Sequence, residues 1–66
     1  MGDYVPGRIR RAREEMALTQ LDLAVRLGVT EHTVANWEAG RVKSIRLQHL
    51  LKLSELTEKP VRWFQP

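Results

Sequence analysis

The sequence of 66 residues contains no cysteine, so neither a disulfide nor a thiolate metal site can stabilise its fold. It also lacks any run of about 20 apolar residues, the length that crosses a bilayer as a helix. No segment resembles a signal peptide. Aromatic residues are few, with two Trp, one Tyr and one Phe. These absences predict one small domain in a reducing compartment, without a membrane segment.

Patterns that indicate an enzyme are missing as well. There is no Ser-His-Asp grouping, no pair of carboxylates set for acid–base work and no glycine-rich phosphate loop. His32 and His49 are too far apart in sequence to suggest a metal site. A domain this small buries only about 60% of its unfolded surface, so a pocket and a core would compete for the same side chains. We expect a binding module with no catalytic residues, metal or cofactor.

The clearest pattern runs from Thr19 to Glu38, where two short helical segments are separated by a glycine. Apolar residues fall on one face of each segment: Leu23, Ala24 and Leu27 on the first, and Val34 and Trp37 on the second. Thr19, with Asp22 three residues later, is placed to cap the first helix, and Thr30 the second. Gly28 supplies the left-handed residue between them. The pattern predicts a helix-turn-helix, with helices at residues 20–27 and 31–39.

Three further helices are expected around this motif. The first begins near Pro6 and ends around residues 17–18, and the fourth begins at Ser44 or Arg46. A short fifth helix covers residues 60–64, whereas residues 1–4 show no pattern and are expected to be loose. The inward stripe of the first helix is expected to be Val5, Ile9, Ala12 and Met16. The stripe of the fourth helix is expected to be Leu47, Leu50, Leu51 and Ser54, with Leu53 and Thr57 alongside, and Trp63 and Phe64 of the fifth helix are expected to close the core. The prediction is an all-α, compact five-helix bundle forming a single domain over residues 1–66.

At these residues the sequence resembles the Cro/repressor-like (XRE-type) helix-turn-helix family of DNA-binding domains, over roughly residues 8 to 64. The resemblance implies a lambda-repressor-like fold and sequence-specific binding of double-stranded DNA by a small transcriptional regulator, a repressor. It also implies a cytoplasmic protein of bacterial, archaeal or phage origin. The similar residues are Thr19-Gln20, Leu23-Ala24, Leu27-Gly28-Val29-Thr30, Thr33-Val34, Trp37-Glu38-Ala39-Gly40, Leu53-Ser54, Thr57, Pro60 and Trp63-Phe64.

Base-reading residues are expected on the second helix of the motif, whose N-terminal part enters the major groove. Asn36 can pair with adenine, Glu31 can accept from cytosine and His32 can donate to guanine. Glu31 is equally well explained by the helix dipole, and the polar residues by simple solvation. The predicted readers are Glu31, His32, Thr33, Ala35 and Asn36.

Phosphate contacts are expected from Gln20, which matches a recurrent glutamine of the family at a helix N-terminus. The net charge of +3 is a modest excess, but basic residues cluster before and after the motif. Such clusters also occur as ordinary solvated faces. The predicted phosphate-binding residues are Gln20, Arg41, Lys43, Arg10 and Arg11.

Other residues are expected to have structural or partner roles. The resemblance implies a partly buried ion pair between Arg13 and Glu38. Leu21 and Val25 lie on the side of their helix away from the core, where they are either scattered exposed residues or a protein contact. Glu58 stands where the family often has glycine, so it is expected in a left-handed conformation.

A homodimer on a pseudo-palindromic operator is the expected assembly. The family commonly dimerises through the end of the domain that here carries Leu51, Lys59, Val61 and Trp63. Two alternatives remain. One is the antitoxin of a toxin–antitoxin pair, which binds DNA and also a protein partner. The other is a helix-turn-helix module used only for protein interaction, whose DNA binding would be weak and salt-sensitive.

Overall fold

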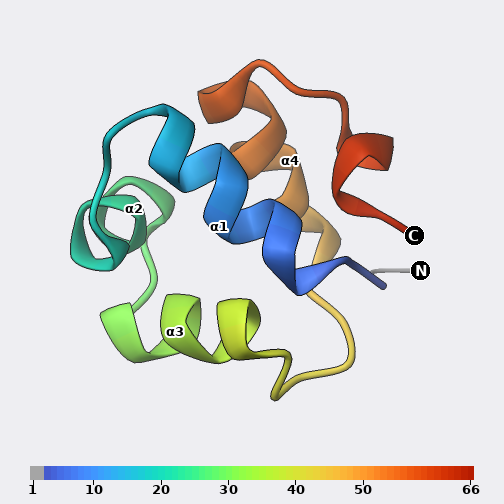
Figure 1. Cartoon of the computed structure of the whole chain (residues 1–66), viewed down its shortest axis with the longest axis horizontal. Helices are drawn as coiled ribbons and strands as arrows, with labels where there is room; N and C mark the ends of the chain where they lie inside the picture. The colour runs from blue at the N-terminus through green and yellow to red at the C-terminus, as the bar shows by residue number, and fades with distance from the viewer. Residues whose placement is uncertain (1–2) are drawn as a thin grey trace.

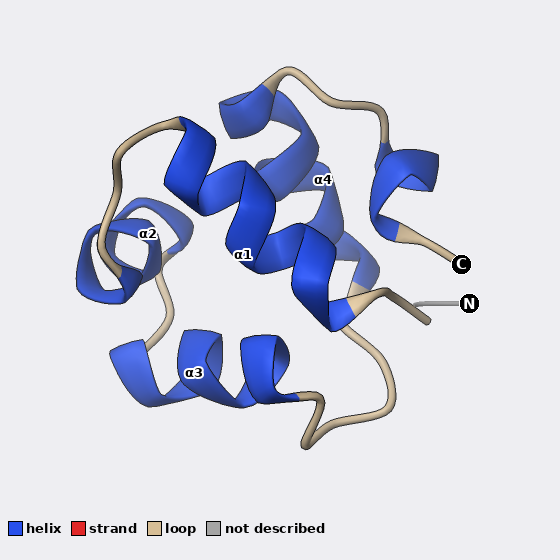
Figure 2. Cartoon of the chain, viewed as in Figure 1, coloured by secondary structure: helices blue, strands red, loops and turns tan. Residues whose placement is uncertain are grey.

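A computed structural model describes residues 3–66, which form four α-helices and one short 3-10 helix (Figures 1 and 2). The helices are α1 (Pro6–Glu15), α2 (Gln20–Leu27), α3 (Glu31–Ala39) and α4 (Leu47–Thr57), followed by η1 (Val61–Phe64). The all-α prediction is confirmed, but the expected fifth α-helix is wrong. Its place is taken by a four-residue 3-10 turn after Pro60, because so short a segment cannot build a ladder of i to i−4 hydrogen bonds.

The core lies where α1 crosses the other helices. Figure 1 shows α1 running across the front of the molecule, with α2 and α3 on one side and α4 and η1 behind and beside it. Side chains from every element meet there without measurable exposure: Ile9, Leu23, Val34, Leu50, Leu53 and Phe64. Val29 also packs against this core. Within residues 3–66, no helix is long and apolar enough to cross a membrane.

Helix α1 ends at Glu15, two to three residues earlier than predicted. Ala17 adopts a left-handed conformation, with φ of 56°, and the N–H of Leu18 donates to the carbonyl of Arg13 at 3.2 Å. Met16 lies beyond the helix and is 36% exposed, so the prediction that it faces inward is wrong. Glycine usually fills this helix-ending role, and an alanine there gives no sequence signal.

Helix α4 directs only some of its predicted residues toward the core. Leu50 and Leu53 are fully buried, whereas Leu47 is 61% exposed and Leu51 is 49% exposed. Two leucine stripes overlap on this helix, and periodicity alone does not distinguish them. The helix begins at Leu47, preceded by Arg46 as its N-cap residue.

At the N-terminal end of the described chain, Asp3 and Tyr4 contact residues of α3 and of the loop that follows it. Residues 1 and 2 lie outside the described part of the chain. Asp3 forms an isolated antiparallel bridge with Ser44, and Tyr4 is buried. The Tyr4 hydroxyl lies 3.0 Å from the carbonyl oxygen of Trp37 and 2.9 Å from that of Val42. A single aromatic residue outside a helix does not belong to a hydrophobic repeat. The contacts that Tyr4 makes with residues 37 and 42 therefore leave no pattern in the sequence.

Candidate nucleic-acid interface

The two helices of the motif are fixed by the caps that the sequence predicts. Thr19 Oγ1 accepts from the N–H of Asp22 at 3.0 Å, and Asp22 Oδ2 accepts from the N–H of Thr19 at 2.9 Å. The hydrogen bond from the Thr19 backbone N–H to the carboxylate lowers the pKa of Asp22, and the Thr19 side chain adds to this effect. Thr30 Oγ1 caps α3 by accepting from the N–H of Thr33 at 3.1 Å. Gly28 takes the predicted left-handed conformation, with φ of 74°, and sets the angle between α2 and α3.

The predicted base-reading residues occupy the first two turns of α3. Glu31 and His32 are exposed, while Thr33, Ala35 and Asn36 are half-buried. The hydroxyl of Thr33 lies 2.9 Å from that of Thr30, so it takes part in the helix cap. These five residues, all polar except Ala35, are called here the polar edge of α3.

A charged network lies behind this edge and joins three helices. The Arg13 guanidinium donates to Glu38 through Nε at 2.7 Å and through Nη2 at 3.0 Å. The side chains of this pair are only 12% and 6% exposed, so the ion pair implied by the resemblance is present and partly buried. The hydrogen bond to Glu38 raises the pKa of Arg13 above its ordinary value.

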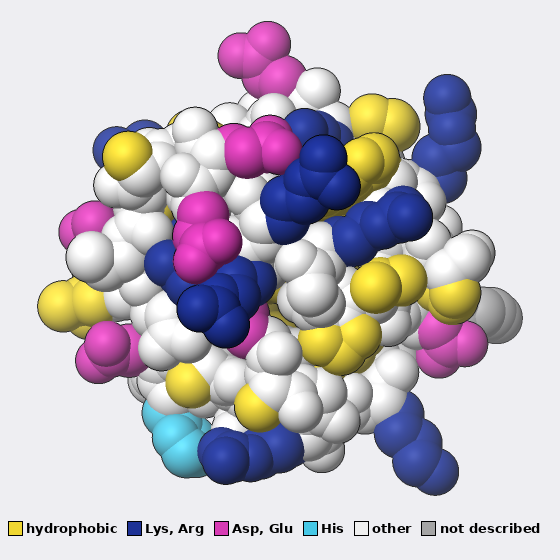
Figure 3. Space-filling model, in the orientation of Figure 1, with side chains coloured by type: hydrophobic (Ala, Val, Ile, Leu, Met, Phe, Trp, Pro, Cys, Tyr) yellow, Lys and Arg dark blue, Asp and Glu magenta, His cyan; other side chains and the backbone are white. Residues whose placement is uncertain are grey.

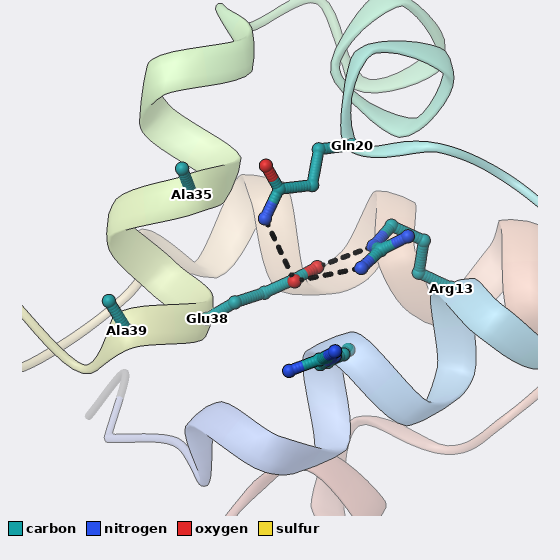
Figure 4. Close-up of a pocket in the computed structure, with 6 residues that line it drawn as sticks. Arg13, Gln20, Ala35, Glu38 and Ala39 are labelled. Carbon is teal, nitrogen blue, oxygen red and sulfur yellow. Dashed lines mark hydrogen bonds and ion pairs between the residues drawn. The ribbon is translucent and has the colours of Figure 1, made fainter.

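Gln20 belongs to the same network, which the sequence did not indicate. Its side-chain Nε2 donates to Glu38 Oε1 at 3.1 Å, and Figure 4 shows its amide oxygen directed away from that carboxylate. Gln20 is the first residue of α2, where a helix leaves its first N–H groups without intrahelical partners. The network therefore holds the N-terminus of α2, with its unpaired backbone N–H donors, beside α3.

An open hollow of about 300 Å³ lies next to this network (Figure 4). It brings together Arg10, Gln20 and Ala35 from the predicted site, and its full lining is Arg10, Arg13, Gln20, Ala35, Glu38 and Ala39. Ala39 was not predicted, although it lies one turn after Ala35 on the same side of α3. Two small side chains thus leave space between α3 and α1.

Two of the arginines of α1 already form ion pairs with acidic residues of the same helix. Arg10 pairs with Glu14 at 3.1 Å, and Arg11 pairs with Glu15 at 3.3 Å. Figure 3 shows basic and acidic side chains intermingled on this face of the molecule. Arg41 and Lys43 are exposed in the loop that follows α3, and Arg41 Nη1 donates to Asn36 Oδ1 at 3.3 Å.

Two other predicted groups lie away from the hollow. Leu21 and Val25 are 53% and 71% exposed on α2. Lys59 pairs with Glu15 at 3.0 Å, and its Nζ also lies 4.5 Å from the centre of the Trp63 ring. Trp63 is half-buried and lies next to the charged side chain of Lys59.

Comparison with protein families decides the class of this chain. The family model for the XRE-type helix-turn-helix matches residues 9–64. The chain belongs to the XRE-type helix-turn-helix family. No curated protein shows significant sequence similarity to it.

Solved structures with the same fold include a repressor and a master regulator. The P22 c2 repressor in complex with a synthetic operator has a TM-score of 0.83 at 23% identity, covering 91% of this chain and 89% of that one. SinR of Bacillus subtilis, described as the master regulator for biofilm formation, was solved in complex with DNA; its TM-score is 0.79 at 24% identity, covering 86% and 90%. SinR was also solved in a complex with SinI.

The same helix-turn-helix fold also occurs in a larger protein. Hydroxypropylphosphonic acid epoxidase from S. wedmorenis has a TM-score of 0.81 at 24% identity. The match covers all of this chain but only 35% of the epoxidase. At this level of identity the likeness concerns the fold alone, so it carries no catalytic function to this chain.

Proposed function

We propose that this chain is a sequence-specific double-stranded DNA-binding protein that acts as a small transcriptional repressor in the cytoplasm. The observation that carries the proposal is the polar edge of α3, supported from behind by the Arg13–Glu38 ion pair and flanked by Gln20 at the start of α2. In a helix-turn-helix, this arrangement places the second helix in the major groove. The folds of the P22 c2 repressor and SinR, both solved with DNA, support it.

The proposal divides the site into two kinds of contact. Base edges are read by the first turns of α3, from Glu31, His32, Thr33, Ala35 and Asn36. Phosphates are held by Gln20 and the flanking basic residues Arg10, Arg11, Arg41 and Lys43. Phosphate contacts fix the register and supply much of the affinity, whereas base contacts choose the sequence.

We further propose that the protein binds a pseudo-palindromic operator as a homodimer. Two copies must then contact each other through the helical bundle itself. The end formed by α4 and η1 presents both apolar and charged side chains. Leu51 is 49% exposed, while Val61 and Trp63 are half-buried beside Lys59. Introducing a charge by Leu51→Glu should abolish dimers in sedimentation measurements while leaving the helical circular dichroism unchanged.

Selection from random duplex DNA at fixed, near-physiological salt tests the function. We expect a two-fold symmetric site with half-site centres about 10 bp apart, the spacing of one turn of a groove. Asn36→Ala should relax one position in each half-site, and Gln48→Ala, on the exposed surface of α4, is the matched control. Failure of the wild type to enrich any sequence would exclude base reading by α3.

A second candidate function is binding of a protein partner, as an antitoxin or as an interaction module. Leu21 and Val25 favour it, because they expose two aliphatic side chains one turn apart on α2. Co-expression with neighbouring gene products and purification of the chain measure this directly. An antitoxin is expected to retain a stoichiometric partner that Val25→Glu releases, with DNA selection unchanged.

A further inference from the structure

The loop that leads from α3 to α4 is held by two neighbouring residues of the N-terminal segment. The hydroxyl of Tyr4 donates to the carbonyl oxygen of Val42 at 2.9 Å and to that of Trp37, near the end of α3, at 3.0 Å. Asp3 forms an antiparallel bridge with Ser44. In Figure 1 the dark blue start of the described chain accordingly lies beside the gold loop. The backbone of this loop is therefore contacted at positions 42 and 44.

Lys43 is the residue between these two contacts. Its side chain is exposed, and it takes part in none of the ion pairs found within residues 3–66. Arg10 and Arg11 are paired with glutamates of α1, and Arg41 is hydrogen-bonded to Asn36. The ammonium group of Lys43 thus extends into solvent from a backbone that is held on both sides.

The Val42 carbonyl depends on Tyr4 more than the Trp37 carbonyl does. The Trp37 carbonyl also accepts from the N–H of Gly40 at 3.1 Å. Within residues 3–66, Tyr4 supplies the one hydrogen bond to the Val42 carbonyl. Tyr4 is only 8% exposed, and burial raises the pKa of its hydroxyl, which therefore keeps the proton that it donates.

Resting on the proposed function, we infer that Tyr4 is a positioning residue for Lys43: its hydroxyl holds the peptide group before Lys43 so that the ammonium group meets a DNA phosphate. A loop that is already ordered in the free protein loses less conformational freedom on binding, which raises affinity without a new contact. Phosphate contacts carry no sequence information directly. Tyr4 therefore determines how tightly an operator is bound and not which operator is chosen.

The experiment measures operator affinity and its salt dependence for wild type, Tyr4→Phe, Lys43→Met and the double variant. Tyr4→Phe keeps the buried ring and removes only the hydroxyl. We expect it to weaken binding to every operator about fivefold, the fold-change that one neutral hydrogen bond corresponds to. Lys43→Met should reduce the salt slope by about one, and Tyr4→Phe by up to about one. In the Lys43→Met background, Tyr4→Phe should cause no further loss of affinity.

Thr57→Val is the matched control. It also removes one hydroxyl donor, because Thr57 Oγ1 donates to the carbonyl of Leu53 at 2.6 Å in the last turn of α4. This variant should leave the affinity and the salt slope unchanged. Affinities are referred to folded protein, with the folded fraction of each variant measured by circular dichroism.

Nuclear magnetic resonance relaxation of the wild type tests the loop without any substitution. The backbone amides of residues 42–44 should have order parameters of about 0.85, the value of a rigid backbone. Order parameters below about 0.6 would show a flexible loop and would overturn the inference.

The positioning role is also overturned if Tyr4→Phe binds as tightly as wild type, if its loss of affinity persists in the Lys43→Met background, or if Thr57→Val weakens binding equally. Each of these outcomes leaves a wild type that selects an operator, so the proposed function stands. A wild type that selects no sequence from random duplex DNA would instead remove the proposed function, together with this inference.

Discussion

Gln20 and Arg13 donate to the same oxygen of Glu38, from 3.1 Å and 3.0 Å respectively. One carboxylate from α3 therefore joins the end of α1 to the first residue of α2 (Figure 4). The orientation of Gln20 depends on an ion pair that also stabilises the fold. Stability and the geometry of the proposed phosphate contact are thus linked through Glu38.

Loss of Arg13 should strongly destabilise the domain. Arg13→Ala leaves Glu38 as an uncompensated and nearly buried charge, which costs roughly 3–5 kcal/mol of unfolding free energy. Arg10→Ala is the matched control, because its pair with Glu14 is exposed and such pairs contribute below about 1 kcal/mol. Urea unfolding followed by circular dichroism measures both. Equal losses in the two variants would contradict the structural role of the buried pair.

Loss of the Gln20 side chain should weaken DNA binding without changing the selected sequence. A hydrogen bond to a charged group is worth about 1.5–3 kcal/mol, so Gln20→Ala should lower affinity for every operator by about tenfold or more. Fluorescence anisotropy with the selected operator and with single-base variants of it measures the effect. A changed order of preference among these operators would show that Gln20 reads sequence instead.

The stability of the domain should decrease as pH falls below the ordinary histidine pKa of 6.5 because of His49. Burial lowers the pKa of His49, with smaller contributions from the charges of Arg46 and Lys52, and its ring lies 5.6 Å from that of Trp37. The unfolded chain therefore binds a proton before the folded chain does, and unfolding becomes easier over that range. The contribution of neutral His49 to the free energy of unfolding is complete above pH 6.5 and declines as the pH falls below that value.

Thermal unfolding between about pH 5 and 8 tests this dependence. His49→Gln should flatten the curve in that range. The lowered pKa values of Glu15 and Asp22 cause losses only further down, as pH falls below their ordinary values of 4.5 and 3.8. A wild-type melting temperature that does not change between about pH 5 and 8 would refute the role of His49.

Replacing Glu58 with glycine should stabilise the protein. Glu58 adopts the left-handed conformation that the sequence predicts, with φ of 58°, and this conformation costs a side-chain-bearing residue about 1 kcal/mol. Glu58→Gly should raise the melting temperature by about 4–8 °C for each 1 kcal/mol recovered. Glu58→Ala removes the carboxylate but keeps Cβ, so an equal rise in that variant would mean that charge, not backbone strain, is responsible.

The sequence predicts the helix-turn-helix closely because its signals are local. Thr19, Gly28 and Thr30 each act on neighbouring backbone groups, and the observed bounds of α2 and α3 match the predicted ones. The left-handed conformation of Glu58 could also be foreseen, since the family pattern marks that position.

The features that were missed depend on contacts between distant parts of the chain. Tyr4 is buried and its hydroxyl donates to the carbonyl groups of residues 37 and 42. Ile45 is only 2% exposed although it lies before α4. Which leucine stripe of α4 faces inward is decided by packing against the rest of the bundle. The bond from Gln20 to Glu38 likewise requires the folded arrangement of α2 and α3, since 18 residues separate the pair.

Hydrogen bonds between residues 5–8 and residues 63–64 have a practical consequence for attaching probes. The N–H of Val5 donates to the carbonyl of Phe64 at 2.7 Å, and Arg8 Nη1 donates to the carbonyl of Trp63 at 2.6 Å. In Figure 1 the C-terminus lies on the edge of the molecule opposite α2. A fluorophore or surface tether attached through the C-terminus therefore leaves Gln20 and the start of α2 facing the solution.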